Sequence, residues 1–176
     1  MSSFSERVIG AAKLDVHIYE EVEKDRTSMA QAITVVALSA VAAGIGSMRG
    51  GFGGLIAVTV AALVGWFIWG WLTYLIGTKL LPEPNTKADP GEMLRTIGFS
   101  AAPGMLRIFG FVPLLGGLVS FAASIWMLVA MVVAVRQALD YSSTKRAIGV
   151  CVIGWLVYVV FAFVIAMALG TGGAAG

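Results

Sequence analysis

Long stretches of the chain contain no charged residue, and their lengths predict a protein that crosses a membrane. No Asp, Glu, Lys or Arg lies at positions 27–48, 50–78, 108–135 or 147–176, and a shorter uncharged stretch lies at 96–106. A helix needs about 20 mainly apolar residues to cross a hydrocarbon core of about 30 Å. Four of these stretches are long enough to cross, and the fifth crosses only if an arginine is tolerated near its end.

Start and stop signals divide these stretches into five predicted spans. The sequence Asp89-Pro90-Gly91-Glu92 is typical of a helix start, with a capping aspartate, a proline in the first turn and an acid three residues after the cap. The break Pro103-Gly104 predicts a kink or an unwound turn in the third span, which we expect to open a crevice against Gly116-Gly117. The membrane domain, 27–170, is expected to hold spans at about 28–48, 55–80, 93–109, 113–135 and 147–169, followed by a flexible tail at 171–176.

The first 26 residues, here called the leader, predict one amphipathic helix that lies along the membrane surface in the cytoplasm. The Ser3–Glu6 spacing is that of a capping box, and Ser28–Gln31 repeats it where the first span begins. Acidic residues at the end of the leader argue against strong adhesion to anionic lipid. The fold expected is an all-α integral membrane protein: five transmembrane helices preceded by a cytoplasmic amphipathic helix. The apolar stripe of the leader consists of Phe4, Val8, Ala11, Leu14, Ile18 and Val22.

Composition supports a membrane protein and excludes several other classes. Hydrophobic residues make up 59% of the 176 positions and charged residues 12%, with a mean hydropathy of +0.90. Soluble domains carry about 25% charged residues, so this chain lacks the charge to cover a globular surface. Disordered chains, disulfide scaffolds, coiled coils and nucleic-acid binders with a basic face are excluded.

Basic residues predict the orientation, because Lys and Arg accumulate in loops on the cytoplasmic side. With five spans and a cytoplasmic N-terminus, ten of the 12 Lys and Arg residues lie inside, and Arg49 and Arg107 lie outside. If the third segment only dipped into the membrane, eight of the 12 would lie inside. Five spans with the C-terminus outside is the better interpretation. The ten inner residues are Arg7, Lys13, Lys24, Arg26, Lys79, Lys87, Arg95, Arg136, Lys145 and Arg146.

The chain carries no pattern of catalytic, cofactor-binding or metal-ligating residues. No Asp or Glu lies within the predicted spans, so the acid that usually marks a proton or ion pathway is missing. His17 has no second histidine or cysteine nearby, and Cys151 is expected to pack as a small apolar residue. No nucleophile elbow, zinc-protease or phosphate-loop motif occurs. We therefore expect no enzyme, no cofactor and no metal.

Small residues recur at four-residue spacing in three of the predicted spans. Such rows let helices approach closely where lipid removes the ordinary hydrophobic driving force. They indicate either an oligomer interface or packing inside one bundle, and we favour packing inside the bundle. The rows are Ala40 and Gly44, then Gly116, Ser120 and Ser124, then Ala162, Ala166 and Gly170.

A series of short motifs runs along the chain in a recognisable order. They are Leu14-Asp15-Val16, YEEVE at 19–23, GFSAAPGML at 98–106, FVPLLGG at 111–117, Ile125-Trp126 and VRQAL at 135–139. From about Arg7 to Leu169 this order resembles the prokaryotic branch of the Yip (Ypt-interacting protein) domain family. The resemblance implies a five-span membrane protein that acts by binding, without catalysis. Eukaryotic members are linked to small GTPases, but this chain lacks their long proline-rich arm, so GTPase binding is not carried over.

Two function classes follow from the resemblance and the residues. The first is a non-catalytic scaffold or accessory subunit that organises lipids or protein partners, which include a membrane protein or a second copy of the chain. The alternative is a lipid scramblase or small-solute transporter with a crevice between the third and fourth spans. We favour the scaffold, because a coupled transporter needs buried carboxylates at the midplane. The short loops favour a bacterial cytoplasmic (inner) membrane, with an ER or Golgi membrane as the eukaryotic alternative.

Arg95 and Arg107 flank the short uncharged stretch and are the candidate contact residues, with Pro103 and Gly104 between them. On a straight helix their backbones lie only about 18 Å apart, less than the hydrocarbon core of about 30 Å. One interpretation is that both side chains extend to the headgroups and anchor a short helix. The other is that Arg107 holds a lipid phosphate and that the bilayer thins there, because the arginine fork binds phosphate through two hydrogen bonds.

The predicted orientation can be tested with single cysteines in a Cys151→Ala background. We expect an impermeant thiol reagent to label Thr171→Cys on intact cells and to leave Asn85→Cys and Ser143→Cys unlabelled until the membrane is opened. Labelling of either loop variant on intact cells, with none at Thr171→Cys, would contradict the orientation.

Overall fold

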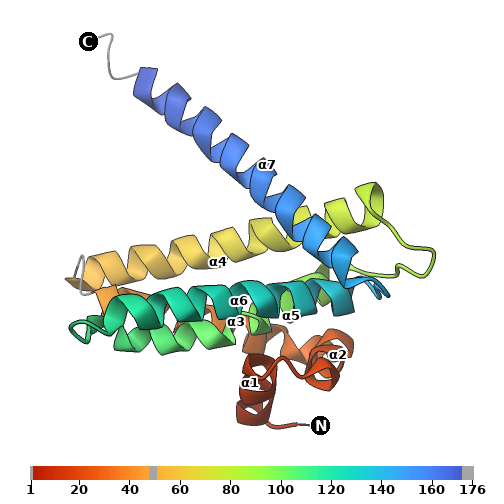
Figure 1. Ribbon diagram of the computed structural model, residues 1–176, viewed down its shortest axis with the longest axis horizontal. Helices are drawn as coiled ribbons and strands as arrows, with labels where there is room; N and C mark the ends of the chain where they lie inside the picture. Colours follow the sequence, from red (N-terminus) through yellow and green to blue (C-terminus); the bar gives the residue numbers. More distant parts are fainter. Residues whose placement is uncertain (1, 48–50, 172–176) are drawn as a thin grey trace.

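The protein is a helical bundle with a pair of short helices packed on one side near one end (Figure 1). The computed structural model describes residues 2–47 and 51–171, apart from the side chains at 51, 162, 165, 166 and 168–171. No strand occurs in these ranges. The elements are α1 (Phe4–Ala12), α2 (Val16–Lys24), the short turn η1 (Arg26–Ser28), α3 (Met29–Ser47), α4 (Gly51–Leu75), the π-helical turn η2 (Ile76–Leu80), α5 (Pro90–Phe99), the 3-10 helix η3 (Ala102–Phe111), α6 (Gly116–Ala138) and α7 (Thr144–Thr171).

Four helices are long and apolar enough to cross a membrane. They cover Arg26–Ser47, Phe52–Leu80, Gly116–Ala138 and Thr144–Phe161. Large apolar side chains are exposed along these helices, where lipid rather than protein covers them. The chain is therefore a multi-pass membrane protein, and four of the five predicted spans coincide with such a helix.

The predicted third span is not one helix but two pieces, α5 and η3. α5 starts at the predicted aspartate cap, which the structure extends to a capping box. The Asp89 side chain accepts from the Glu92 amide at 2.9 Å and the Glu92 carboxylate accepts from the Asp89 amide at 2.8 Å. It ends at Phe99, and a 3-10 helix continues from Ala102. A 3-10 helix rises about 2.0 Å per residue against about 1.5 Å in an α-helix, so the two pieces together reach about 35 Å. The segment therefore runs the length of the bundle (Figure 1).

The leader forms two helices, so the prediction of one continuous helix on the membrane surface is wrong. The chain turns between α1 and α2 at Leu14, whose φ is 64°, a conformation that costs a non-glycine residue about 1 kcal/mol. The Tyr19 hydroxyl donates to the Ala11 carbonyl at 3.1 Å and closes the pair. Ala11, Tyr19 and Val22 are fully buried. The apolar stripe packs against the bundle rather than against lipid.

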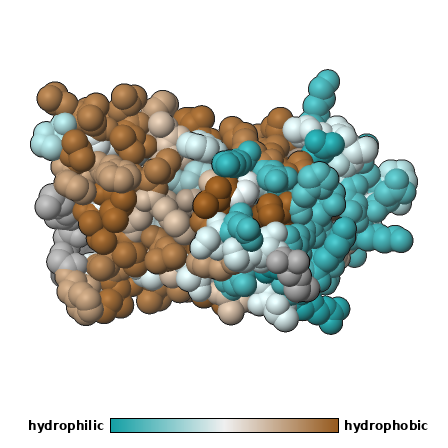
Figure 2. Space-filling model, turned by 90° about the horizontal axis from the view of Figure 1, so that it is seen from below, coloured by the Kyte–Doolittle hydropathy of each residue, from teal (hydrophilic) through white to brown (hydrophobic). Residues whose placement is uncertain are grey.

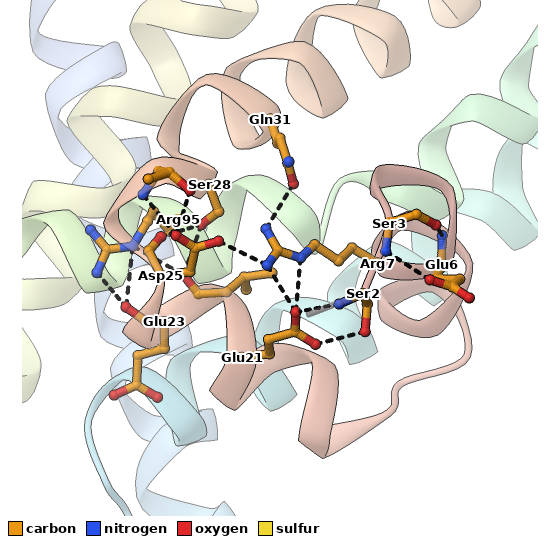
Figure 3. Close-up of polar contacts among 12 residues, drawn as sticks. Ser2, Ser3, Glu6, Arg7, Glu21, Glu23, Asp25, Ser28, Gln31 and Arg95 are labelled. Carbon is orange, nitrogen blue, oxygen red and sulfur yellow. Dashed lines mark hydrogen bonds and ion pairs between the residues drawn. The ribbon is translucent and has the colours of Figure 1, made fainter.

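Arg7 connects the two leader helices to the start of α3 (Figure 3). Its guanidinium lies 2.8 Å from the carboxylates of Glu21 and Asp25, and it donates to the Gln31 side chain at 3.0 Å. The hydrogen bonds from Arg7 and Ser2 lower the pKa of Glu21 to about 2. Gln31 is thus a partner of Arg7, and the predicted capping box at Ser28–Gln31 is wrong because the Ser28 hydroxyl donates to the Val22 and Asp25 carbonyls instead.

Glu23, also in the leader, lies in a less favourable environment. Its side chain is only 8% exposed. Burial raises its pKa to about 7, and the nearby negative charges of Asp140 and Glu92 add to the shift. At neutral pH the folded leader therefore holds a carboxyl group that resists ionisation.

The tightest backbone contacts are made by three glycines, of which only Gly116 belongs to a predicted small-residue row. Gly46 of α3 lies against the backbone of Arg107 and Gly110 in η3, and Gly116 of α6 lies against Gly110 from the other side. The crevice predicted at Gly116-Gly117 is therefore wrong, because this is a close backbone contact. In the first row, Ala40 is buried and Gly44 faces Leu55 of α4. The side chains of Ala162, Ala166 and Gly170 and the tail at 172–176 lie outside the described residues.

Gly116 and Gly117 provide a matched test of this packing. A Cβ at Gly116 would overlap the Gly110 carbonyl, whereas a Cβ at Gly117 would meet nothing within 4 Å. We expect Gly116→Ala to destabilise the protein by about 2 kcal/mol or more, and Gly117→Ala to stabilise it by up to about 1 kcal/mol, because alanine favours the helix. Thermal unfolding in detergent measures both. Equal melting temperatures for the two variants would contradict the contact.

Glu23→Gln tests the carboxyl group in the leader. The pKa of Glu23 is about 7 in the folded protein, against an ordinary value of 4.5. The folded state therefore binds this proton more tightly, and the resulting contribution to the free energy of unfolding is fully present below pH 4.5 and is lost as the pH rises through about 7. We expect Glu23→Gln to be more stable than the wild type by about 1–3 kcal/mol at pH 8 and by much less at pH 5. Unfolding at both pH values measures the difference. Glu20→Gln, whose carboxylate is 43% exposed, is the control, and an equal pH dependence in both variants would contradict the assignment.

Candidate functional site

A cavity of about 400 Å³ lies inside the bundle and is here called the central cavity. Its walls come from every long helix and from both pieces of the third segment, and they are mainly apolar. Its volume is within the range of about 300–1,000 Å³ that is typical of sites for small molecules. The residues that line it include Ser39, Trp66, Ile68, Trp69, Ser100, Arg107, Met127, Met131, Trp155 and Tyr158.

The central cavity opens sideways between α4 and α7. The two helices approach at Gly154, where an added Cβ would lie 3.2 Å from the Trp69 ring. Beyond this point α7 diverges from the bundle (Figure 1). Ile68, Trp155 and Tyr158 line the cavity and yet are 54%, 57% and 55% exposed. These side chains form a rim, so the cavity is open to whatever surrounds the helices, which is lipid in a membrane.

Two tryptophans of α4 hold the wall of the cavity in place. The Trp66 indole donates to the Leu94 carbonyl of α5 at 3.1 Å, and the Trp69 indole donates to the Met131 sulfur of α6 at 3.3 Å. Both rings therefore face inward, since each N–H finds its acceptor across the bundle. This explains the aromatic residues in the middle of a membrane-spanning helix, where an anchor to the headgroups has no function.

Pro103 and Gly104 lie within the bundle and do not face lipid. Both residues are buried. A Cβ at Gly104 would overlap the Ser39 hydroxyl and would lie 2.7 Å from the Met127 sulfur. The break therefore lets η3 pack closely between α3 and α6. It positions the residues that follow it, and the structure gives neither Pro103 nor Gly104 a direct contact with the surroundings.

Arg107 belongs to η3 and lines the central cavity. Its Nη2 donates to the Ser124 hydroxyl at 2.8 Å, and Ser124 in turn donates to the Ser120 carbonyl. This is the one hydrogen bond that the Arg107 side chain makes among the described residues, although a guanidinium has five N–H donors. The predicted row of Ser120 and Ser124 thus serves as a support for Arg107.

Arg95 is buried and binds the leader (Figure 3). Its Nε donates to the carbonyls of Val22 at 3.0 Å and Glu23 at 3.2 Å, and its Nη2 also donates to the Glu23 carbonyl. These carbonyls lie at the end of α2, where a positive charge is favourable. The structure therefore places Arg95 against the chain's own leader rather than beside a lipid headgroup, and it separates Arg95 from Arg107.

A second cavity, of about 440 Å³, lies between the leader and the end of α6. It is lined by charged groups of both signs, including Glu20, Glu23, Lys24, Arg136 and Asp140. Among the described residues, no group of three or more His, Cys, Asp or Glu side chains is placed to hold a metal ion. This cavity provides a hydrated surface and not a defined site.

Sequence reasoning identified Arg107 but missed most of the residues that surround it. Met127 and Met131 lie four residues apart on α6, a spacing that shares one helix face, but nothing in the sequence shows which face is internal. Ser39 lies in α3, Tyr158 lies in α7 and Ser100 caps the end of α5. Their meeting at one cavity depends on how those helices pack.

Comparison with known proteins agrees with this architecture. The family model of the Yip1 domain matches residues 16–166. No curated protein and no solved structure matches the chain significantly. The matched region begins with α2 and ends in α7, so it includes the central cavity and the whole third segment. Because it covers most of the sequence, the chain belongs to the Yip1 domain family.

Proposed function

We propose that this protein is a non-catalytic membrane scaffold that organises lipids, and that Arg107 holds the phosphate of an anionic lipid. The observation that carries the proposal is the charge of Arg107 in a mainly apolar cavity without an acidic partner. Its side chain makes one hydrogen bond among the described residues, to Ser124. The Arg107 side chain is partly buried. A charge in an apolar environment is stabilised by a partner of opposite charge, and an anion from the membrane supplies one.

No carboxylate of the chain is available for this role. All ten Asp and Glu residues lie in the leader, in the region 83–92, or at Asp140. The region 83–92 and Asp140 lie at the end of the bundle opposite the loop that joins η3 to α6 (Figure 1). Among the described residues, no carboxylate of the leader forms an ion pair with Arg107. A phosphate matches the two-pronged donor geometry of a guanidinium, which makes arginine the preferred partner.

The central cavity also suits the apolar part of a lipid. Trp66, Trp69, Met127 and Met131 provide aromatic and flexible thioether surface, and methionine adapts to irregular apolar shapes. The opening between α4 and α7 allows an acyl chain to enter from the side without leaving the membrane. These features support a bound phospholipid with its headgroup at Arg107.

We propose five spans, with α5 and η3 together forming the third, an N-terminus in the cytoplasm and a C-terminus outside. Ten of the 12 Lys and Arg residues then lie on the cytoplasmic side. Arg107 lies in the outer half of the membrane in this orientation, so the lipid comes from the outer leaflet. The short loops favour the prokaryotic branch of the family and a bacterial cytoplasmic membrane. Partners of this kind of scaffold include membrane proteins or a second copy of the chain.

A lipid scramblase or small-solute transporter is the second candidate, and the sideways opening of the central cavity is the observation that favours it. A broken helix next to a cavity is also common in transporters. The absence of any Asp or Glu from 27–82 and from 93–139 argues against ion-coupled transport. Scrambling requires no coupling, so reconstitution is needed to separate it from scaffolding.

Arg107→Gln tests the proposed lipid site. A hydrogen bond to a charged group contributes about 1.5–3 kcal/mol, so we expect co-purified anionic lipid, measured by mass spectrometry, to fall by about tenfold while the protein still folds. Lys79→Gln, which removes an exposed charge near the other end of the bundle, should retain the lipid of the wild type. Equal retention by both variants would show that Arg107 is an anchor only.

The same preparations test the second candidate. Vesicles that contain the wild-type protein and a fluorescent phospholipid are treated with an impermeant reductant, which bleaches only the outer leaflet. A scaffold leaves about half of the fluorescence protected, as in protein-free vesicles. Full bleaching in intact vesicles would replace scaffolding with scrambling as the function.

A further inference from the structure

The leader contacts α6 at an unexpected depth. The Trp126 indole donates to the Ala12 carbonyl, at the end of α1, with a distance of 2.8 Å. Trp126 lies twelve residues before the end of α6 at Ala138, which corresponds to about 18 Å along the helix. The end of α1 therefore lies beside the middle of a membrane-spanning helix.

The residue of α4 that lies at the same level as Trp126 can be found from the hydrogen bond between Trp69 of α4 and Met131 of α6. The two residues lie at one level, and α4 and α6 run in the same direction (Figure 1). Val64 lies five residues before Trp69 on α4, and Trp126 lies five residues before Met131 on α6. Val64 therefore lies at about the level of Trp126. Val64 is 53% exposed and is twelve residues from the start of the Phe52–Leu80 span. This level is the middle of the membrane on the α4 side.

Charged groups lie at the same level on the leader side. Lys13 and Asp15 follow Ala12 directly in the turn between α1 and α2, and both side chains are exposed. Ionised side chains are strongly disfavoured in hydrocarbon and need water or headgroups. Figure 2, which views the leader side, shows hydrophilic surface extending from one end to about the middle of the molecule. Beyond it the surface is hydrophobic.

We infer that the protein is a one-sided wedge, which brings the polar headgroups of the adjacent leaflet up to the level of Trp126 on the leader side only. α6 is apolar as far as Val135, but on the leader side the length left for hydrocarbon is then Gly116–Trp126, ten residue steps or about 15 Å. The 25 residues of α4 span about 37 Å. The bilayer adapts to such a hydrophobic mismatch by becoming thinner or by bending. The inference is independent of the lipid site at Arg107.

The leader itself does not require anionic lipid for this position. Residues 1–26 contain four basic and six acidic side chains, so the leader does not adhere to a negative surface through its charge. It is held by protein contacts: the Trp126 hydrogen bond, the Arg95 hydrogen bonds to Val22 and Glu23, and the Arg7 hydrogen bond to Gln31 of α3. The groups that surround the leader are therefore the zwitterionic headgroups of the bilayer and their water.

Two single-cysteine variants at one level test the inference in the full chain. Lys13→Cys and Val64→Cys are made in a Cys151→Ala background, labelled with bimane and reconstituted in phosphatidylcholine vesicles. Quenching by iodide in water is compared with quenching by phosphatidylcholine brominated in the middle of its acyl chains. We expect iodide to quench the Lys13→Cys label at least fivefold more than the Val64→Cys label, and the brominated lipid to show the reverse order.

A third measurement shows whether the leader stays docked in the bilayer. Tryptophan quenches bimane at contact, so adding Trp126→Phe to Lys13→Cys should increase the fluorescence, while adding it to Val64→Cys should not. No such increase would mean that the leader leaves α6 in the membrane, and the inference would be wrong. Strong bromine quenching at Lys13→Cys, or strong iodide quenching at Val64→Cys, would also overturn it.

Discussion

The interior of a membrane offers no hydrogen-bond partner to backbone amides and carbonyls that are not paired within a regular helix. This constraint explains how the bundle is organised around its third segment, where the α-helix is interrupted. Irregular backbone is tolerated at membrane depth where protein covers it. Residues 93–100 and 102–104 are all buried, and α3 and α6 pack against η3 from two sides. Gly46, Gly110 and Gly116 let these backbones meet without side chains between them. The protein cover is complete over the first turn of η3, whereas its second half exposes Leu106, Ile108, Phe109 and Phe111.

The same segment determines where the two arginines act. Arg95 lies in the α-helical piece and faces the leader, whose carbonyls accept its hydrogen bonds. Arg107 lies in the 3-10 piece, and its side chain enters the central cavity. The interruption after Phe99 therefore divides the segment into a half that holds the leader and a half that provides a cationic site. The Yip1 domain match includes both halves.

The bundle presents different surfaces on its two sides. On the α4 and α7 side, apolar side chains are exposed along most of each span and the central cavity opens to lipid. On the other side, the leader covers part of α5 and α6 and replaces lipid with charged and polar groups (Figure 2). The proposed role in organising lipids rests on this asymmetry between the two sides.

Local sequence determined the features that depend on neighbouring residues or on composition. Stretches without charge predicted the four long helices, because each helix meets hydrocarbon on its own. The Ser3–Glu6 capping-box spacing and the capping aspartate of Asp89-Pro90 predicted two helix starts, because both signals lie within four residues of the helix end. Pro103-Gly104 predicted the interruption of the third segment, because proline lacks the amide that a helix requires.

Tertiary structure alone decided how the leader folds and what the charged residues contact. The stripe from Phe4 to Val22 fits one helix as well as two, and only packing against the bundle selects the turn at Leu14. Arg95 and Arg107 look alike in the sequence, but one meets carbonyls 72 and 73 residues away and the other a cavity built from several helices. The partners of the two arginines depend on which faces of the helices pack together. The sequence does not show this, because an apolar helix without an amphipathic stripe has no pattern that marks its inner face.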